Sequence, residues 1–168
     1  ADAVFNINQT RVPISTHREP KILPITSLGL EGSNLILYGS ASHSEDRNTP
    51  VSSFGPSDSI DVRATLFIPS EHQGIDGETY VVISVEGIGL FYRSADGGYH
   101  EWDGDLATLQ SYKATHPLNV SEELIAFDEF TPSSVGVSSA NLTVYFAYAV
   151  PGTDVFVYST TGIQFTIE

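Results

Sequence analysis

The stretch FYRSADGGYHEWDGDLATL, residues 91–109, gathers most of the side chains in this chain that could do chemistry. Within nineteen residues it combines several aromatic rings, one histidine, four carboxylates and three glycines. Aromatic rings stack on the apolar face of a sugar, and carboxylates accept hydrogen bonds from its hydroxyl groups. One interpretation is therefore a carbohydrate-binding hairpin that uses Tyr92, Tyr99, Glu101 and Trp102.

A turn beside a core anchor is the simpler interpretation of the same stretch. Asp96-Gly97 and Asp103-Gly104 are turn-forming pairs, because Gly accepts positive φ and Asp bonds to its own backbone. Trp102 is the single Trp, and a β-sandwich commonly buries one large aromatic ring. Strand alternation also points Tyr99 and Glu101 to one side and Trp102 to the other, so the turn is favoured over a sugar platform.

Calcium is a second ligand that this stretch suggests. Asp96, Asp103 and Asp105 offer hard oxygen ligands. The pattern stops short of an EF-hand loop, because Ala107 stands where a third ligand belongs and no Glu closes the cage. We expect no required cofactor, with Ca²⁺ as the one alternative.

The motifs of the common enzyme classes are missing from the sequence. There is no His-Glu-x-x-His, no Gly-x-Ser-x-Gly, no phosphate-binding glycine loop and no Cys. We therefore expect a protein without enzymatic activity. Three Asn-x-Ser/Thr acceptor patterns, at Asn8, Asn119 and Asn141, are candidate glycosylation sites if the source organism glycosylates its secreted proteins.

Charge and composition narrow the location and the partners. The net charge of the 168 residues is −14, which disfavours nucleic acid and anionic lipid surfaces. No apolar stretch approaches the roughly 20 residues that span a bilayer, so we expect no membrane insertion. A surface rich in hydroxyl groups, with 20 Ser and 14 Thr, and a start at Ala1-Asp2-Ala3 that suits signal-peptidase cleavage indicate a secreted or cell-surface protein.

Period-two alternation of apolar and polar residues dominates the chain and predicts an all-β fold. We expect one domain over residues 1–168, built as a single two-sheet antiparallel β-sandwich of the immunoglobulin-like or jelly-roll-like type. His43–Ser59 is expected to be a long polar surface loop, and Asp105–Ala114 one short helix. The expected strands are 3–7, 35–42, 60–68, 79–85, 90–93, 99–102, 142–148, 155–158 and 163–167.

Residues 1–25 combine a first strand with an arm that contains three prolines. Ala3, Phe5 and Ile7 alternate with Val4, Asn6 and Asn8, and Arg11, Arg18 and Lys21 follow with only Glu19 among them. Residues 64–168 hold 2 basic and 14 acidic groups, so the arm and the body have complementary charge. This conjunction predicts that the first strand is added to a sheet of a neighbouring copy. The alternative is that the strand pairs within its own sheet.

From Thr79 onward the chain resembles a β-sandwich module that recurs in large secreted and surface proteins of bacteria. The stretches that carry the resemblance are TYVVISV, LFYRSADGGYHEWDGDLATL, NLTVYFAYAV and VFVYSTTGIQFTIE. The chain departs from the module at Ala147-Tyr148, where Gly-Tyr is expected, and at Thr161-Gly162, where Pro is expected. The resemblance covers the C-terminal half and implies an extracellular, non-catalytic module.

The function expected from the sequence is that of an extracellular structural protein acting through contacts with other proteins. Copies of the same chain are the expected partner, joined into a filament or surface layer by N-terminal strand addition. The alternative is a carbohydrate-binding module with glycans as partners.

Overall fold

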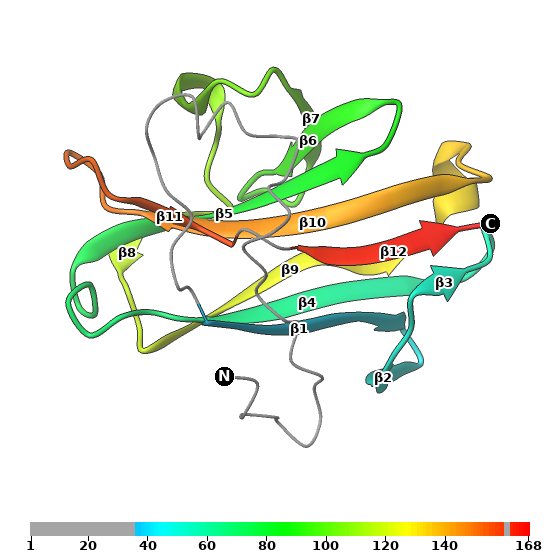
Figure 1. Ribbon diagram of the computed structural model, residues 1–168, viewed down its shortest axis with the longest axis horizontal. Coiled ribbons are helices and arrows are strands. Elements are labelled where there is room, and N and C mark those ends of the chain that lie inside the picture. Colours follow the sequence, from blue (N-terminus) through cyan, green and yellow to red (C-terminus); the bar gives the residue numbers. More distant parts are fainter. Residues whose placement is uncertain (1–35, 160–161) are drawn as a thin grey trace.

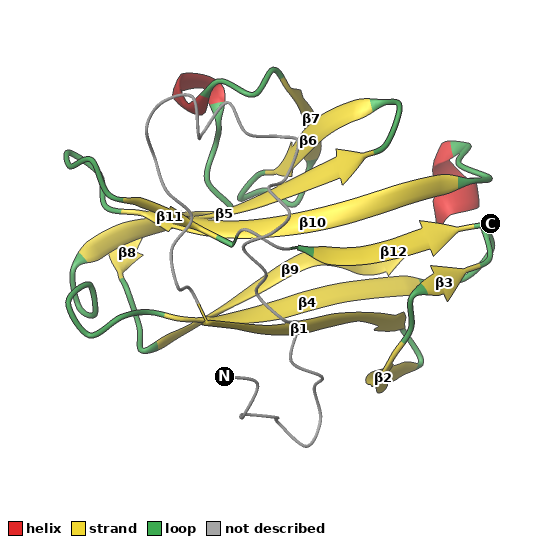
Figure 2. Cartoon of the chain, viewed as in Figure 1, coloured by secondary structure: helices red, strands yellow, loops and turns green. Residues whose placement is uncertain are grey.

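A computed structural model describes residues 36–159 and 162–168 of the chain. In these residues nearly all regular structure is β, arranged as two sheets that lie face to face (Figures 1 and 2). The predicted all-β sandwich is therefore confirmed. The helical segments that the described residues contain have at most four residues each, so none of them could span a membrane.

The smaller sheet has the strand order β2-β1-β4-β9 in the part of the chain that the structure describes. Its centre is the antiparallel pair β1 and β4, with Gly39 opposite Ala64. A Cβ added at Gly39 would lie 2.5 Å from the carbonyl oxygen of Arg63, so only glycine allows the two backbones to approach this closely. The strands are β1 (Ile36–His43), β2 (Asp46–Pro50), β4 (Ile60–Phe67) and β9 (Ser121–Phe130).

The larger sheet follows the order β3-β12-β10-β5-β6-β7, with β11 beside β10 and β8 beside β5. Its described pairs are antiparallel except β3 with β12, which is parallel. The strands are β3 (Ser53–Phe54), β5 (Asp76–Val85), β6 (Gly89–Arg93), β7 (Tyr99–Trp102), β8 (Lys113–Pro117), β10 (Ala140–Ala149), β11 (Phe156–Tyr158) and β12 (Ile163–Ile167).

The core lies between the two sheets because alternate residues of each strand face the opposite layer. On β4 the inner side chains include Val62 and Leu66, and on β10 they include Val144 and Phe146, all fully buried. The stabilisation therefore comes mainly from the apolar area removed from water between the layers.

Two of the expected local elements are wrong. The expected loop at residues 43–59 contains β2 and β3, which are too short and too polar for alternation to reveal. The expected helix at residues 105–114 is one 3₁₀ turn, η1 (Leu106–Thr108), followed by β8 from Lys113. Asp105 caps that turn by accepting from the backbone N–H of Ala107, but the next residues return to extended backbone.

Candidate functional site

An apolar groove of about 400 Å³ opens between the two sheets on the side where β9 ends one sheet and β7 ends the other. A groove of this size falls in the range of about 300–1,000 Å³ that is typical of ligand pockets. Glu101 is the one charged side chain in its lining, which otherwise consists of Ile83, Val85, Phe91, Tyr99, Phe127, Phe130, Val135, Val137, Ala140, Leu142 and Ile167. The groove therefore suits an apolar occupant.

One wall of the groove is built from three stacked or tilted aromatic rings. The ring centroids of Tyr99 and Phe127 lie 5.4 Å apart, and those of Phe127 and Phe130 lie 4.8 Å apart. Tyr99 comes from β7 and the two Phe residues from β9, so the wall joins the two edge strands. Aromatic surfaces of this kind dominate the energetics of protein interfaces.

Two irregularities in the pairing of β9 with β4, one on each side of Phe127, bring Phe127 and Phe130 to the groove. Val62 of β4 pairs with Phe127 and Arg63 pairs with Ile125, so Ala126 is the additional residue. Strict alternation would send Ala126 and Phe127 to opposite faces, but both are buried. β9 is absent from the strands expected from the sequence, and the aromatic wall was therefore not predicted. Residues 121–130 contain the apolar side chains of a strand, namely Leu124, Ile125 and Phe127, but nothing in the residue types marks the irregular pairing.

The inner end of the groove is closed by two side chains of the β6–β7 hairpin. The Tyr99 hydroxyl donates to the carbonyl oxygen of Ala126 at 2.7 Å, and the Arg93 guanidinium donates to the carbonyl oxygen of Ile125. Burial raises the pKa of Tyr99, although the nearby Arg93 charge acts in the opposite direction. The hydroxyl therefore stays protonated and remains a donor. The other end of the groove lies at η2 (Pro132–Val135), where Val135 is exposed.

The four residues of the expected sugar site do not meet on one surface. Tyr92 and Trp102 are each only 6% exposed and form a second apolar cluster with Val82 on the outer face of the larger sheet. The indole N–H of Trp102 donates to the carbonyl oxygen of Asp105 at 2.8 Å. Tyr99 and Glu101 lie on the opposite side of the hairpin, in the groove. Neither buried ring offers a free face to a sugar.

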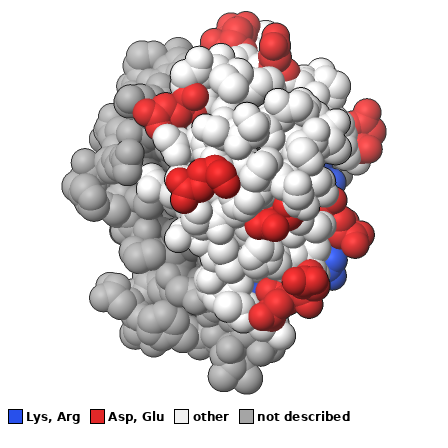
Figure 3. Space-filling view, turned by 90° about the vertical axis from the view of Figure 1, so that its right-hand side faces the viewer, with Lys and Arg blue, Asp and Glu red and all other residues white. Residues whose placement is uncertain are grey.

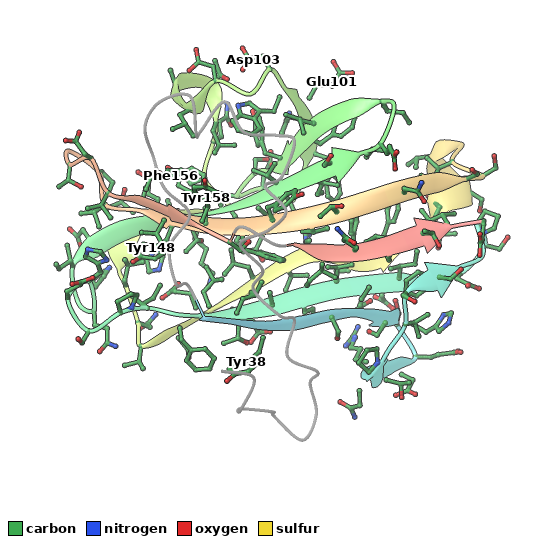
Figure 4. All side chains as sticks on the ribbon, viewed as in Figure 1. Tyr38, Glu101, Asp103, Tyr148, Phe156 and Tyr158 are labelled. Carbon is green, nitrogen blue, oxygen red and sulfur yellow. The ribbon has the colours of Figure 1, made fainter. Side chains whose placement is uncertain are left out.

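The three aspartates considered for calcium bond to local turns, Asp96 in the β6–β7 turn and Asp103 and Asp105 in the turn that contains η1. Asp96 accepts from the Ser94 hydroxyl and from the Gly98 backbone, and the Ser94 bond in particular lowers the pKa of Asp96. Asp103 accepts from Thr108, which lowers its pKa, while Asp105 caps η1. Across residues 36–159 and 162–168, no three acidic, His or Cys side chains form a group that could hold a metal. Figure 4 shows the side chains of Glu101 and Asp103 at the top of the view, above β7.

Ser94, His100 and Asp96 lie together but do not form a nucleophile with its base. The Ser94 hydroxyl has a single proton, and it donates that proton to Asp96. His100 Nε2, 3.0 Å from the same hydroxyl, must then be the donor in their contact. A ring nitrogen that donates to the serine cannot take its proton, so the arrangement holds the turn together.

Two of the candidate glycosylation sites are described. The side-chain amide of Asn119 donates to Glu122 at 2.8 Å, and that of Asn141 donates to Glu86 at 3.1 Å. Both residues are exposed on the surface. Asn8 and the expected assembly residues Ala3, Phe5, Ile7, Arg11, Arg18 and Lys21 lie outside the described residues.

The basic side chains of the described residues already have partners within the protein, whereas most of the acidic side chains there have no basic partner. Arg47 and Arg63 both contact the fully buried carboxylate of Asp61, at 2.6 and 3.0 Å. Lys113 lies 3.7 Å from Glu122, and Arg93 lies over the rings of Tyr99 and Tyr112. Residues 36–168 hold 18 acidic and 4 basic groups, and acidic side chains predominate on the face shown in Figure 3.

No protein-family model, curated protein or solved structure matches this chain. The resemblance to a module of bacterial surface proteins therefore stays a prediction, and the function must be argued from the groove and the charge.

Proposed function

We propose that this protein is an extracellular structural subunit that assembles through protein–protein contacts, and that the groove between β9 and β7 is its acceptor surface. The observation that carries the proposal is the apolar lining of a groove between β9 and β7, each of which pairs on one side only among the described residues. An apolar concave surface that opens between two sheet edges can accept an apolar segment of another chain.

The shape of the groove favours a segment of polypeptide as its occupant. In the described part of the chain, β9 pairs only with β4, and β7 pairs only with β6. An extended segment between these edges would bury every second side chain in the groove and keep its backbone along a sheet edge. Filling the groove would remove its apolar walls from water, at about 25 cal/mol for each Å².

The acidic surface supports an extracellular assembly whose contacts are selective. Residues 36–168 hold eighteen acidic groups and four basic ones, so these parts of two copies repel each other. Close association therefore needs a specific contact that is locally basic or apolar. A filament or surface-layer subunit fits these properties, because its contacts must recur in one geometry.

Light scattering coupled to size-exclusion chromatography tests the proposal. The wild-type protein is expected to form oligomers, and Val135→Asp, at the mouth of the groove, is expected to reduce them to monomers. Val120→Asp is the matched control, because Val120 is 63% exposed and Val135 is 62% exposed, but only Val135 lines the groove. A monomeric wild type, or equal loss of assembly in both variants, would contradict the proposal.

A further inference from the structure

We infer that the occupant of the groove is the N-terminal segment of a second copy of this chain, with Ala3, Phe5 and Ile7 directed inward. The inference rests on the proposed function, and it adds which segment binds and from which molecule. Three features carry it: the side-chain pattern of residues 3–7, the charge that follows them and the reach of the chain.

The side-chain pattern of residues 3–7 suits the groove between the edge strands β9 and β7. In an extended segment Ala3, Phe5 and Ile7 face one way, and Val4, Asn6 and Asn8 face the other. Ala3 and Ile7 are then about 13 Å apart, at about 3.3 Å for each residue. Phe5 would meet the aromatic wall formed by Phe127 and Phe130, where ring-to-ring contacts add to the burial of apolar area.

A short occupant also suits the groove because side chains of the β6–β7 hairpin close part of it. The bonds from Arg93 and Tyr99 to the backbone of β9 occupy the carbonyl groups of Ile125 and Ala126, so a strand cannot pair along that stretch. Only the section from Phe127 toward η2 is left open. A short apolar segment of five residues matches that section better than a long strand does.

Charge selects this segment over other apolar segments of the chain. Arg11, Arg18 and Lys21 follow it closely, with Glu19 as the only acid between them. The basic side chains of the described residues already contact partners within the protein. Other acidic side chains, among them Glu101 in the groove, therefore have no basic side chain of the described residues left to neutralise their charge. A basic arm that follows an inserted apolar segment would lie against acidic surface and strengthen the contact.

The length of the connecting chain allows insertion into a neighbour. Residues 8–35 span at most about 92 Å when fully extended, at about 3.3 Å for each residue. This reach also permits a chain to fill its own groove. A second copy is the occupant that accounts for assembly, and the experiment separates the two cases.

Disulfide trapping tests the inference in the full-length protein, because the natural chain contains no Cys. One copy carries Ala140→Cys in the groove, and a differently tagged copy carries Phe5→Cys. A disulfide needs its two Cβ atoms within about 4.5 Å. We expect residue 5 of one copy to lie that close to residue 140 of the other, so oxidation should give a mixed dimer. Val120→Cys replaces Ala140→Cys as the control outside the groove and is expected to give none.

A second series of variants tests the alternation of the segment. Cys at position 5 is expected to trap the Ala140→Cys variant, and Cys at position 4 or 6, whose side chain faces away from the groove, is not. Equal trapping at positions 4, 5 and 6 would overturn the inference, because it would indicate random collisions rather than a seated strand.

The outcomes distinguish failure of the inference from failure of the proposed function. If Phe5→Cys does not trap Ala140→Cys while Val135→Asp still abolishes assembly, the groove is the acceptor but this segment is not its occupant. If a chain that carries both substitutions closes only within itself, the occupant is the chain's own segment and the inference is wrong. If Val135→Asp leaves assembly intact, the proposed function itself is wrong.

Discussion

Glu122 is the buried carboxylate that joins β8 to β9, and its surroundings make the stability of the protein depend on pH. Its carboxylate is fully buried, accepts from the backbone and the side chain of Asn119 at 2.8 Å each, and lies 2.8 Å from His116 Nε2. Burial alone would raise the pKa of Glu122, but these bonds outweigh it and lower the pKa below its usual 4.5. Burial alone would lower the pKa of His116, but its bond to the Ala114 carbonyl and the Glu122 carboxylate raise it above 6.5.

We expect the contribution of this pair to the free energy of unfolding to be greatest between the two usual pKa values. Because the pKa of Glu122 is lowered on folding, its contribution is lost as the pH falls through the folded value. Because the pKa of His116 is raised, its contribution is full below 6.5 and is lost as the pH rises through the folded value. Denaturant titration should show that His116→Gln costs about 1 kcal/mol near pH 5.5 and less near pH 8.5. An equal cost at both pH values would contradict this assignment.

Trp102 is expected to act as a core anchor. Trp102→Ala should lower the free energy of unfolding by about 3–5 kcal/mol, because it empties the centre of the cluster with Tyr92 and Val82. Trp102→Phe, which keeps a ring in place, should cost clearly less. Thermal and denaturant melts measure both variants. A fully stable Trp102→Ala variant that no longer binds a glycan would instead support the carbohydrate-binding alternative.

At the scale of elements, the close pairing of β1 with β4 depends on Gly39. A methyl group there would meet the Arg63 carbonyl and the Cα of Ala64, so Gly39→Ala should push the two strands apart and destabilise the fold by about 1–3 kcal/mol. Gly55→Ala is the control, because the nearest atom to its added Cβ is 3.5 Å away. Its effect should stay within about 0.5 kcal/mol. Equal melting curves for the two variants would show that the strands can separate without cost.

The elements that alternation specifies strongly were predictable, and those that depend on local irregularity were not. β4, β10 and β12 carry a clean period of two, and the structure contains each of them at the expected place. β2 has no buried side chain and therefore no pattern to read. In β9 the additional residue at Ala126 breaks the period where Phe127 turns inward, which is the feature that creates the groove wall.

The candidate site was predicted only at its edge. Tyr99 and Glu101 were singled out for a sugar site, and both line the groove instead. Phe127, Phe130 and Val135 come from segments whose places in the fold depend on long-range pairing. Their meeting with β7 follows from the order of strands in two sheets, which residue types do not encode directly.

At the scale of the whole molecule, assembly should weaken with salt but should not depend on charge alone. Raising NaCl from about 50 to about 500 mM shortens the Debye length from about 14 to about 4 Å and screens the attraction between the basic arm and the acidic body. Arg11→Glu should therefore weaken assembly at low salt and have little effect at high salt. Sedimentation velocity measures both dependences. An oligomer that grows with salt and does not respond to Arg11→Glu would place the contact on apolar surface alone.

In the assembled protein a neighbouring chain should fill the groove between β9 and β7. Electron cryo-microscopy of the assembled wild-type protein tests this most directly. We expect an extended segment between the two edge strands, with a ring against Phe127 and Phe130 and with its chain traceable to another subunit. An empty groove, with subunits joined through a different surface, would contradict it.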